Sequence, residues 1–152
     1  MSTGSVVPAT ALDTSVIISG VLSWHEHHQA ASAALLNLLE SRSEIVLPLH
    51  TLVESYSVMT RLPPPHRVSS RDAVDILEGS FRDRSTLIGL AGNEGWDLIK
   101  NLDHSSITGG MSYDGLILAC AMKGGAQRLL TFNRAHFERI RNKGIEIVVP
   151  GQ

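Results

Sequence analysis

The sequence is short of cysteine and of long apolar runs, and each shortage excludes a class of protein. Cys120 is the only cysteine, which excludes an internal disulfide framework or a cysteine-rich zinc site, and we expect a reducing, cytoplasmic setting. Apolar stretches such as residues 116–122 are well short of the ~20 residues that cross a bilayer. Residues 1–10 lack the cationic start and apolar centre of a secretory signal. We therefore expect neither a membrane span nor a secretory leader.

Neither sign of charge dominates the composition. The chain has 13 Lys and Arg against 15 Asp and Glu, a net charge of -2, which argues against a protein that coats nucleic acid by bulk attraction but permits a local basic patch. Apolar residues make up 43% and charged residues 18%, as is typical of globular rather than disordered proteins. A chain of 152 residues is then expected to form one domain, residues 1–152.

Short, branched apolar segments alternate with segments of helical periodicity along the chain. We predict strands at 9–12, 44–47, 86–88, 128–132 and 145–149. We predict helices over 14–22, 25–41, 48–62, 93–102, 113–123 and 134–142, and a further helix from a capping box at Ser69 to Phe81. This alternation predicts an α/β fold, namely a three-layer α/β/α sandwich around a mainly parallel sheet of four to five strands.

Fifteen carboxylates are too many to be informative singly, so we select those with no Lys or Arg within four positions. Five acids remain, which are Asp13, Glu26, Glu54, Glu94 and Asp114. Glu26 and Glu94 lie in polar stretches and are expected to be solvated. Each of the other three is a lone acid within an otherwise apolar segment, where a buried carboxylate takes up a proton or destabilises the fold unless it meets a cation.

Convergence of these three acids is the economical interpretation. The ligand crevice of an open parallel sheet lies beyond the carboxyl ends of its strands, which is where Asp13 and the residues after Leu47 and Leu130 are expected to gather. Oxygen ligands of this kind suit Mg²⁺ or Mn²⁺ better than zinc, and such sites usually handle phosphates. Each acid also has a structural alternative: Asp13 as a helix cap, Glu54 as a solvated side chain, and Asp114 as an acid favoured by the helix dipole.

Four segments carry a resemblance to a known family when they are taken in order. They are Leu12-Asp13-Thr14-Ser15 after the first strand, Glu54 in the helix after the second, Tyr113-Asp114 opening an apolar helix, and Leu130-Thr131-Phe132-Asn133 followed by Phe137. The order and spacing of this set resemble those of the PIN-domain ribonucleases, particularly toxins of the VapBC type. The resemblance covers nearly the whole chain, from Ala11 to Val149.

The resemblance implies an endoribonuclease that depends on Mg²⁺ or Mn²⁺, with Asp13, Glu54 and Asp114 as the catalytic and metal-binding acids. Asn133 stands where the family often has a fourth acid, and it offers a carbonyl oxygen without a charge. The resemblance also implies an antitoxin that covers the acid cluster, and a homodimer.

Three further residues complete the predicted site. We expect Thr131 to orient water together with Asn133, and Ser15 to support the site. Arg134 follows Asn133 at the start of a helix, where it is a candidate for contact with an RNA phosphate. Its alternatives are to pair with an acidic residue or to face water.

Two other functions remain open at this point. One is a non-catalytic module that binds RNA or protein and has lost its metal because of Asn133. The other is a metal-dependent phosphatase with Asp13 as nucleophile, which is disfavoured because the usual second aspartate, two residues on, is Ser15.

Three other motifs favour structural interpretations. The run His25-Glu26-His27-His28 resembles a zinc motif, but position 29 is Gln29 rather than the second histidine that the metalloprotease spacing requires. Gly109-Gly110 lacks the Lys-Ser/Thr that ends a phosphate-binding loop. Cys120 has apolar neighbours and no nearby base, which favours a core thiol over a nucleophile.

Overall fold

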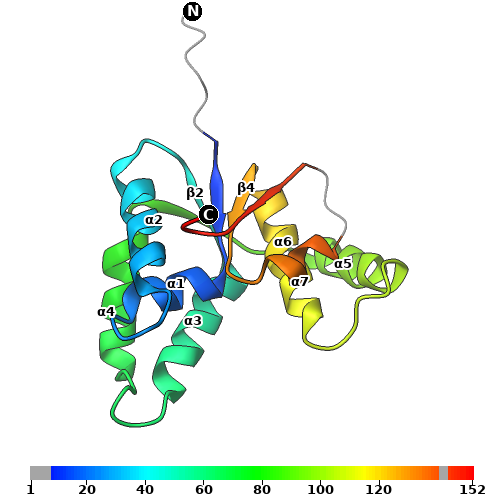
Figure 1. Cartoon of the computed structure of the whole chain (residues 1–152). Helices are drawn as coiled ribbons and strands as arrows, with labels where there is room; N and C mark the ends of the chain where they lie inside the picture. Colours follow the sequence, from blue (N-terminus) through cyan, green and yellow to red (C-terminus); the bar gives the residue numbers. More distant parts are fainter. Residues whose placement is uncertain (1–7, 141–143) are drawn as a thin grey trace, which may run out of the picture.

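The computed structural model describes residues 8–140 and 144–152. Within them the chain forms five strands and seven helices (Figure 1). In chain order these are β1 (Thr10–Leu12), α1 (Thr14–Val21), α2 (His28–Glu40), β2 (Ile45–Pro48), α3 (Leu49–Arg61), α4 (Ser70–Phe81), β3 (Ser85–Ile88), α5 (Gly92–His104), α6 (Met111–Lys123), β4 (Arg128–Leu130), α7 (Arg134–Glu138) and β5 (Glu146–Val148).

The strands form one parallel sheet in the order β3-β2-β1-β4-β5. Leu12 of β1 pairs with Leu130 of β4, so the residues that follow these two strands leave the sheet side by side. The chain crosses back between parallel strands through helices, as parallel pairing requires. The predicted α/β sandwich around a parallel sheet is confirmed.

The two faces of the sheet belong to two apolar clusters because successive side chains of a strand point to opposite faces. Leu12, Ile45, Leu47 and Leu130 pack with side chains of α1, α2, α3 and α4. Their sequence neighbours Ala11, Val46 and Leu129 pack with side chains of α5, α6 and α7. Figure 1 shows α1–α4 on one side of the strands and α5–α7 on the other. The molecule therefore has the three predicted layers.

Several predicted boundaries are shifted. The helix expected over 25–41 begins at His28, and the helix expected from Tyr113 begins at Met111. Pro48 was expected to open a helix, but it is the last residue of β2 and has extended dihedrals (φ -62°, ψ 135°), so α3 begins at Leu49. The helix expected over 134–142 ends at Glu138, and residues 141–143 lie outside the described part of the chain.

Two local features fix the ends of helices. Gly124 ends α6 against the sheet: a Cβ there would lie 2.6 Å from Cγ1 of Val46, so only glycine lets the helix approach β2 this closely. Ser69 caps α4, as predicted, by accepting a hydrogen bond from the backbone N–H of Asp72 over 3.1 Å. No helix in the described residues has the length and apolarity needed to cross a membrane.

Candidate active site

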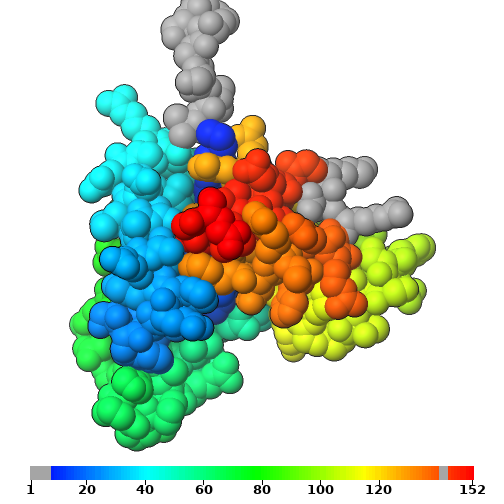
Figure 2. Space-filling view, viewed as in Figure 1, coloured from blue at the N-terminus to red at the C-terminus, as the bar shows by residue number. Residues whose placement is uncertain are grey.

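A cavity of about 640 Å³ opens beyond the carboxyl ends of the central strands β1 and β4. In Figure 2 the surface is hollowed between the blue-to-green side of the molecule and its yellow-to-orange side. The lining comes from α1, α3, the start of α6, and α7 with the loop before it. The lining residues are Asp13, Thr14, Ser15, Ile18, Glu54, Val58, Thr108, Gly110, Met111, Asp114, Asn133 and His136.

Asp13 is the most deeply buried acid of this pocket, with 3% of its surface exposed. It follows β1 directly, and its backbone N–H donates to the carbonyl of Leu130 over 3.0 Å. Its carboxylate oxygen Oδ2 accepts hydrogen bonds from the hydroxyls of Ser15 and Thr131, each over 2.7 Å. The carboxylate makes no capping bond to α1. Asp13 is therefore held by hydroxyl groups and does not serve as a side-chain cap.

The two hydroxyls are themselves fixed by the backbone. Ser15 Oγ accepts from the N–H of Phe132 over 3.0 Å, and Thr131 Oγ1 accepts from the N–H of Asn133 over 2.9 Å. Each hydroxyl proton is then directed to Asp13. Burial raises the pKa of Asp13, and the charge of Glu54 adds to this, while the bonds from Thr131 and Ser15 oppose it by stabilising the charged form.

Glu54 lies in the middle of α3, the helix that follows β2. Its Oε1 accepts a hydrogen bond of 2.5 Å from the hydroxyl of Thr14, and its Oε2 lies 3.7 Å from Nε2 of His50, one turn earlier in the helix. The Glu54 side chain is 38% exposed. The ring of His50 stacks on Tyr113, with centroids 5.0 Å apart. Glu54 is thus the most accessible acid of the pocket. Contacts with Thr14 of α1 and His50 of α3 orient its carboxylate.

Asp114 lies in the first turn of α6, and its side chain is 19% exposed. Burial and the negative charges of Asp13 and Glu54 raise its pKa, whereas His136 and His50 act in the opposite direction. Nδ1 of His136 lies 3.5 Å from Oδ2 of Asp114. The three selected acids are therefore close enough to repel one another. No three His, Cys, Asp or Glu side chains in the described residues are already gathered as a metal would hold them.

The supporting residues differ in their placement. Asn133 lines the pocket, and its amide makes no capping bond to α7. Thr131 was expected to orient water together with Asn133, but it is fully buried and its hydroxyl is committed to Asp13. The structure therefore makes Thr131 a positioning residue for Asp13. Ser15 both lines the pocket and bonds to Asp13.

Arg134 makes its contacts with α7 and β5 and not in the pocket. Its Nη2 donates to the carbonyl of Ile147 over 3.2 Å, and its Nε lies 3.6 Å from Oε1 of Glu138. The arginine follows Asn133 in sequence, but it does not line the cavity. The alternative in which Arg134 pairs with an acidic residue is the one seen in the structure, so the expected phosphate contact has no geometric support.

Sequence reasoning missed three polar residues of the site: Thr14, His50 and His136. His50 precedes Glu54 by four residues, which places both on one helix face, and this spacing was a usable signal. His136 was less accessible to prediction because its partner Asp114 lies on a different helix. Thr14 was named only as part of the first resemblance segment, with no role in the site, yet its hydroxyl donates to Glu54.

The other motifs take structural places. His28 lies in α2, where its Nδ1 is 2.9 Å from the carbonyl of Ser19. The loop with Gly109 leads into the pocket wall at Gly110, and Gly109 has the left-handed φ of +63° that favours glycine. Cys120 is buried, and burial raises the pKa of its thiol, which agrees with a core thiol.

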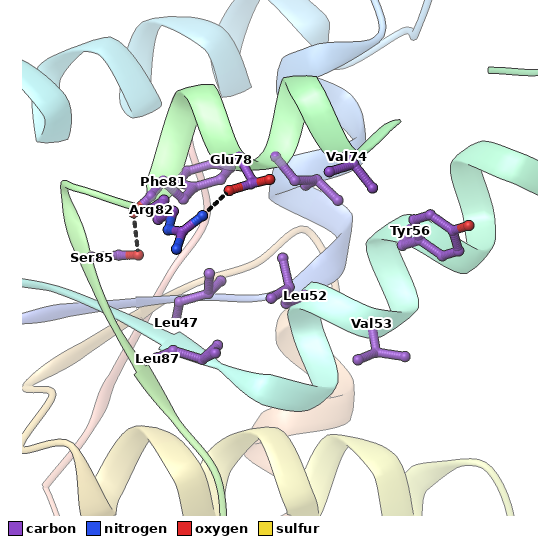
Figure 3. Close-up of a pocket in the computed structure, with 11 residues that line it drawn as sticks. Leu47, Leu52, Val53, Tyr56, Val74, Glu78, Phe81, Arg82, Ser85 and Leu87 are labelled. Carbon is purple, nitrogen blue, oxygen red and sulfur yellow. Dashed lines mark hydrogen bonds and ion pairs between the residues drawn. The ribbon is translucent and has the colours of Figure 1, made fainter. Parts of the chain in front are cut away.

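A second cavity of about 440 Å³ lies on the other side of α3, between α3, α4 and the edge strand β3. Figure 3 shows its side chains pointing into the space between the two helices and the strands. The lining is apolar except for Ser85 and for Arg82, which pairs with Glu78. The apolar members are Leu47, Leu52, Val53, Tyr56, Val74, Leu77, Phe81 and Leu87. We call this cavity the apolar groove.

The sequence profile of the PIN domain matches residues 10–143. The chain belongs to the PIN domain family. Ribonuclease VapC40 of Mycobacterium tuberculosis is 36% identical to this PIN domain over 133 residues, covering 86% of the chain and 93% of the relative. Ribonuclease VapC27 of the same organism is 33% identical over 144 residues, covering 93% and 97%.

Solved structures show the same fold. The VapBC2 structure from Rickettsia felis, bound to a DNA fragment from its promoter, superposes on this PIN domain with a TM-score of 0.65 and 18% identity, covering 93% of the chain and 98% of the matched chain. VapC20 of Mycobacterium tuberculosis, described as a sarcin-ricin loop cleaving toxin, superposes with a TM-score of 0.62 and 16% identity, covering 79% and 86%. The predicted resemblance to PIN-domain proteins of the VapBC type is confirmed.

Proposed function

We propose that this PIN domain is an endoribonuclease, hydrolysing RNA phosphodiester bonds as the toxin of a toxin–antitoxin pair. One observation carries the proposal: Asp13, Glu54 and Asp114 reach one pocket from three separate parts of the fold, and besides burial the charge of Glu54 helps to raise the pKa of Asp13, while the charges of Asp13 and Glu54 help to raise the pKa of Asp114. Such repulsion lowers the stability of a fold, so acids placed together in this way indicate a functional site. The relatives named as ribonucleases, which align over most of this chain, agree with it.

The donor set of the pocket fits a hard divalent cation such as Mg²⁺ or Mn²⁺. Its acids offer only oxygen ligands, and their mutual repulsion is the cost that a cation removes. Asp13 and Asp114 would hold the ion, with Glu54 binding it directly or through water, and the carbonyl oxygen of Asn133 would add a neutral ligand. The bound cation would supply polarisation of the phosphodiester and a nucleophile near neutral pH.

The protein's own residues supply orientation and proton transfer. Ser15 and Thr131 fix the Asp13 carboxylate by donating to its Oδ2. Thr14 holds one oxygen of Glu54, which leaves the half-exposed carboxylate in position to take a proton from the attacking water. Asn133 lines the same pocket and would orient water there. His136, beside Asp114, lies where a substrate phosphate would approach.

A catalytically silent module that binds RNA or protein is the competing function, because Asn133 replaces a possible fourth acid. A metal-dependent phosphatase is weaker still, since Ser15 donates to Asp13 where that chemistry would require a second acid. Calorimetric titration with Mn²⁺ separates a metal-binding enzyme from the silent module. Binding that is lost in Asp114→Asn supports the enzyme.

The direct test is incubation of the purified chain with total RNA and either Mg²⁺ or Mn²⁺, followed by mapping of new RNA ends. We expect discrete new ends from the wild-type chain and none from Asp114→Asn. Asp97→Asn, which neutralises an exposed acid on α5, is the matched control and should cleave like the wild type. Absence of new ends with every RNA and both metals would contradict the proposal.

We further propose that an antitoxin docks with apolar side chains in the apolar groove. Several structural neighbours were solved as toxin–antitoxin pairs, among them VapBC-1 of nontypeable Haemophilus influenzae. Val53 in the groove and Glu54 in the pocket are neighbours on α3, about 100° apart around the helix. An antitoxin bound in the apolar groove therefore lies beside the three acids. To cover the acids as well, the antitoxin needs a further segment outside the groove.

Growth rescue tests this docking. A cognate antitoxin should restore growth when it is expressed with the wild-type chain. It should fail with Val53→Asp, which leaves RNA cleavage intact. A homodimer is also expected of such a toxin, and sedimentation analysis would measure it.

A further inference from the structure

Five aromatic rings form a continuous row outside the acid pocket. His27 stacks on Phe132 with centroids 4.4 Å apart and planes within 11°. The His27 ring is 5.7 Å from that of His25, which is 6.1 Å from the ring of Trp24. The Trp24 ring is in turn 4.3 Å from that of His66. These separations are those of favourable aromatic pairs. We call this set the ring row.

The ring row joins three segments that are far apart in the sequence. Trp24, His25 and His27 lie between α1 and α2, His66 lies between α3 and α4, and Phe132 lies between β4 and α7. Phe132 connects the row to the pocket. Its backbone N–H donates to Ser15 Oγ, the hydroxyl that in turn donates to Asp13. The next residue along the chain, Asn133, lines the pocket itself. The row therefore begins at the pocket wall and extends away from it.

Trp24, His27 and His66 remain exposed although the rings contact one another, whereas His25 and Phe132 are partly buried. Trp24 is 49% exposed, and the side chain of His27 is 46% exposed. A ring cluster that served only to fill the core would be buried, as Phe81 and Phe137 are. His27 is the N-cap residue of α2, yet its side chain makes no capping hydrogen bond. Neither core packing nor helix capping accounts for these two side chains.

We propose that the ring row is a stacking platform for unpaired RNA bases that flank the bond to be cleaved. The inference rests on the proposed nuclease function and names its substrate class, which is single-stranded RNA entering the pocket past Phe132. Aromatic side chains, including histidine, are the surfaces on which unpaired bases stack. Such stacking tolerates any base, because every base has a flat face.

The charges on this segment favour bases over the phosphate backbone. Residues 22–28 contain no Lys or Arg, and Glu26 among them is 81% exposed. A carboxylate at this place repels phosphates but has little effect on a stacked base. A metal site fits less well, because Nδ1 of His25 accepts a hydrogen bond from the N–H of His27.

Binding of short RNA tests the platform. Fluorescence anisotropy would measure the dissociation constants of labelled single-stranded oligoribonucleotides in the uncleaving Asp114→Asn background. Adding Trp24→Ala or His27→Ala should weaken binding about fivefold or more, as expected for the loss of one stacked base. Trp24→Phe should restore most of the affinity. Trp96→Ala removes the other tryptophan, 66% exposed on α5, and as the matched control should change nothing.

Two further measurements distinguish the loss of base stacking from a general loss of RNA binding. An oligonucleotide with abasic sites next to the scissile position should bind the Asp114→Asn chain and its Trp24→Ala derivative equally. The slope of log Kd against log salt should not change in Trp24→Ala, because no phosphate contact is removed. In a Trp96→Phe background, Trp24 is the sole tryptophan, and RNA should quench its fluorescence.

The outcomes distinguish this inference from the function on which it rests. If wild-type chain cleaves RNA while Trp24→Ala and His27→Ala bind oligonucleotides as tightly as their parent, the platform is wrong and the nuclease assignment stands. Equal losses in Trp24→Ala and Trp96→Ala would also overturn the platform. If the wild-type chain neither binds nor cleaves RNA, the proposed function itself fails and the platform fails with it.

Discussion

The hydroxyl of Thr131 donates a 2.7 Å hydrogen bond to Oδ2 of Asp13, joining two residues 118 positions apart in the chain. The bond follows from the pairing of Leu12 with Leu130 at the ends of β1 and β4, since Asp13 and Thr131 are the residues that directly follow these two strands. Asp13 is nearly inaccessible, so its orientation depends on such internal donors. The sheet register thereby sets the position of an acid in the pocket.

Thr131→Val is expected to reduce RNA cleavage by at least tenfold and to destabilise the fold by about 1–3 kcal/mol. The substitution keeps the side-chain shape but removes a donor to Asp13 and the acceptor for the N–H of Asn133. The lost bond also raises the pKa of Asp13 further, so the acid limb of the pH–rate profile should move to higher pH. Urea unfolding and the cleavage profile measure the two effects.

Thr131→Ser is the control for this prediction, because it retains the hydroxyl. It should keep the pH–rate profile of the wild type even if it loses some stability. A valine variant whose profile matches that of the serine variant would show that the hydroxyl does not act on Asp13.

Much of the fold was accessible from the sequence because burial on both faces of a parallel sheet leaves short apolar strands between helices. The order of the lone acids was also informative, since Asp13 follows a strand and Asp114 begins an apolar helix. The prediction of Pro48 as a helical residue was wrong because a proline suits both a helix start and an extended residue before it.

The sequence could not show which residues distant along the chain the fold brings into contact. Glu94 remains 43% exposed, in keeping with the expected solvation, but its carboxylate also accepts a 2.6 Å hydrogen bond from Lys123 on α6, 29 residues away. Thr131 was expected to orient water together with Asn133, and its burial beside Asp13 follows only from the sheet register. Neither relationship has a local sequence pattern.

Neutralising the acids should abolish cleavage without unfolding the protein. Asp13→Asn, Glu54→Gln and Asp114→Asn each remove one of three charges that repel one another. We expect no detectable RNA cleavage from any of them. The free energy of unfolding without metal should be unchanged or increased by on the order of 1 kcal/mol at neutral pH. Variants that unfold, together with a wild type that binds no cation, would make these acids structural.

The pH dependence of stability gives a second measurement on Asp114. Its pKa in the folded protein is raised above the ordinary value of 3.8, so the folded state binds its proton more tightly than the unfolded state does. The destabilisation is therefore fully present above the raised pKa and disappears as pH falls toward the ordinary value. The extra stability of metal-free Asp114→Asn over the wild type should shrink across that window. A difference that is constant with pH would contradict this origin.

Asn133→Asp is expected to tighten Mn²⁺ binding. The side chain already lines the pocket with the three acids, and a fourth carboxylate adds attraction of a few kcal/mol at most after its repulsion from the others is deducted. Faster cleavage need not follow. Calorimetry of both proteins at one ionic strength measures the change, and an unchanged affinity would mean that Asn133 does not face the cation. Asn93→Asp, on α5 outside the pocket, is the control.

Arg134→Ala should weaken RNA binding no more than Arg139→Ala does. Sequence proximity to Asn133 predicts a phosphate contact for Arg134, but its guanidinium is engaged by the carbonyl of Ile147 and by Glu138. Removing it should instead cost about 0.5–1 kcal/mol of stability through the lost contact with β5. Arg139, exposed at the end of α7, offers a matched loss of charge. Anisotropy titrations of both variants at several salt concentrations measure the comparison. A selective loss in Arg134→Ala, with a salt slope reduced by about one counterion, would show that the arginine leaves Ile147 to meet the substrate.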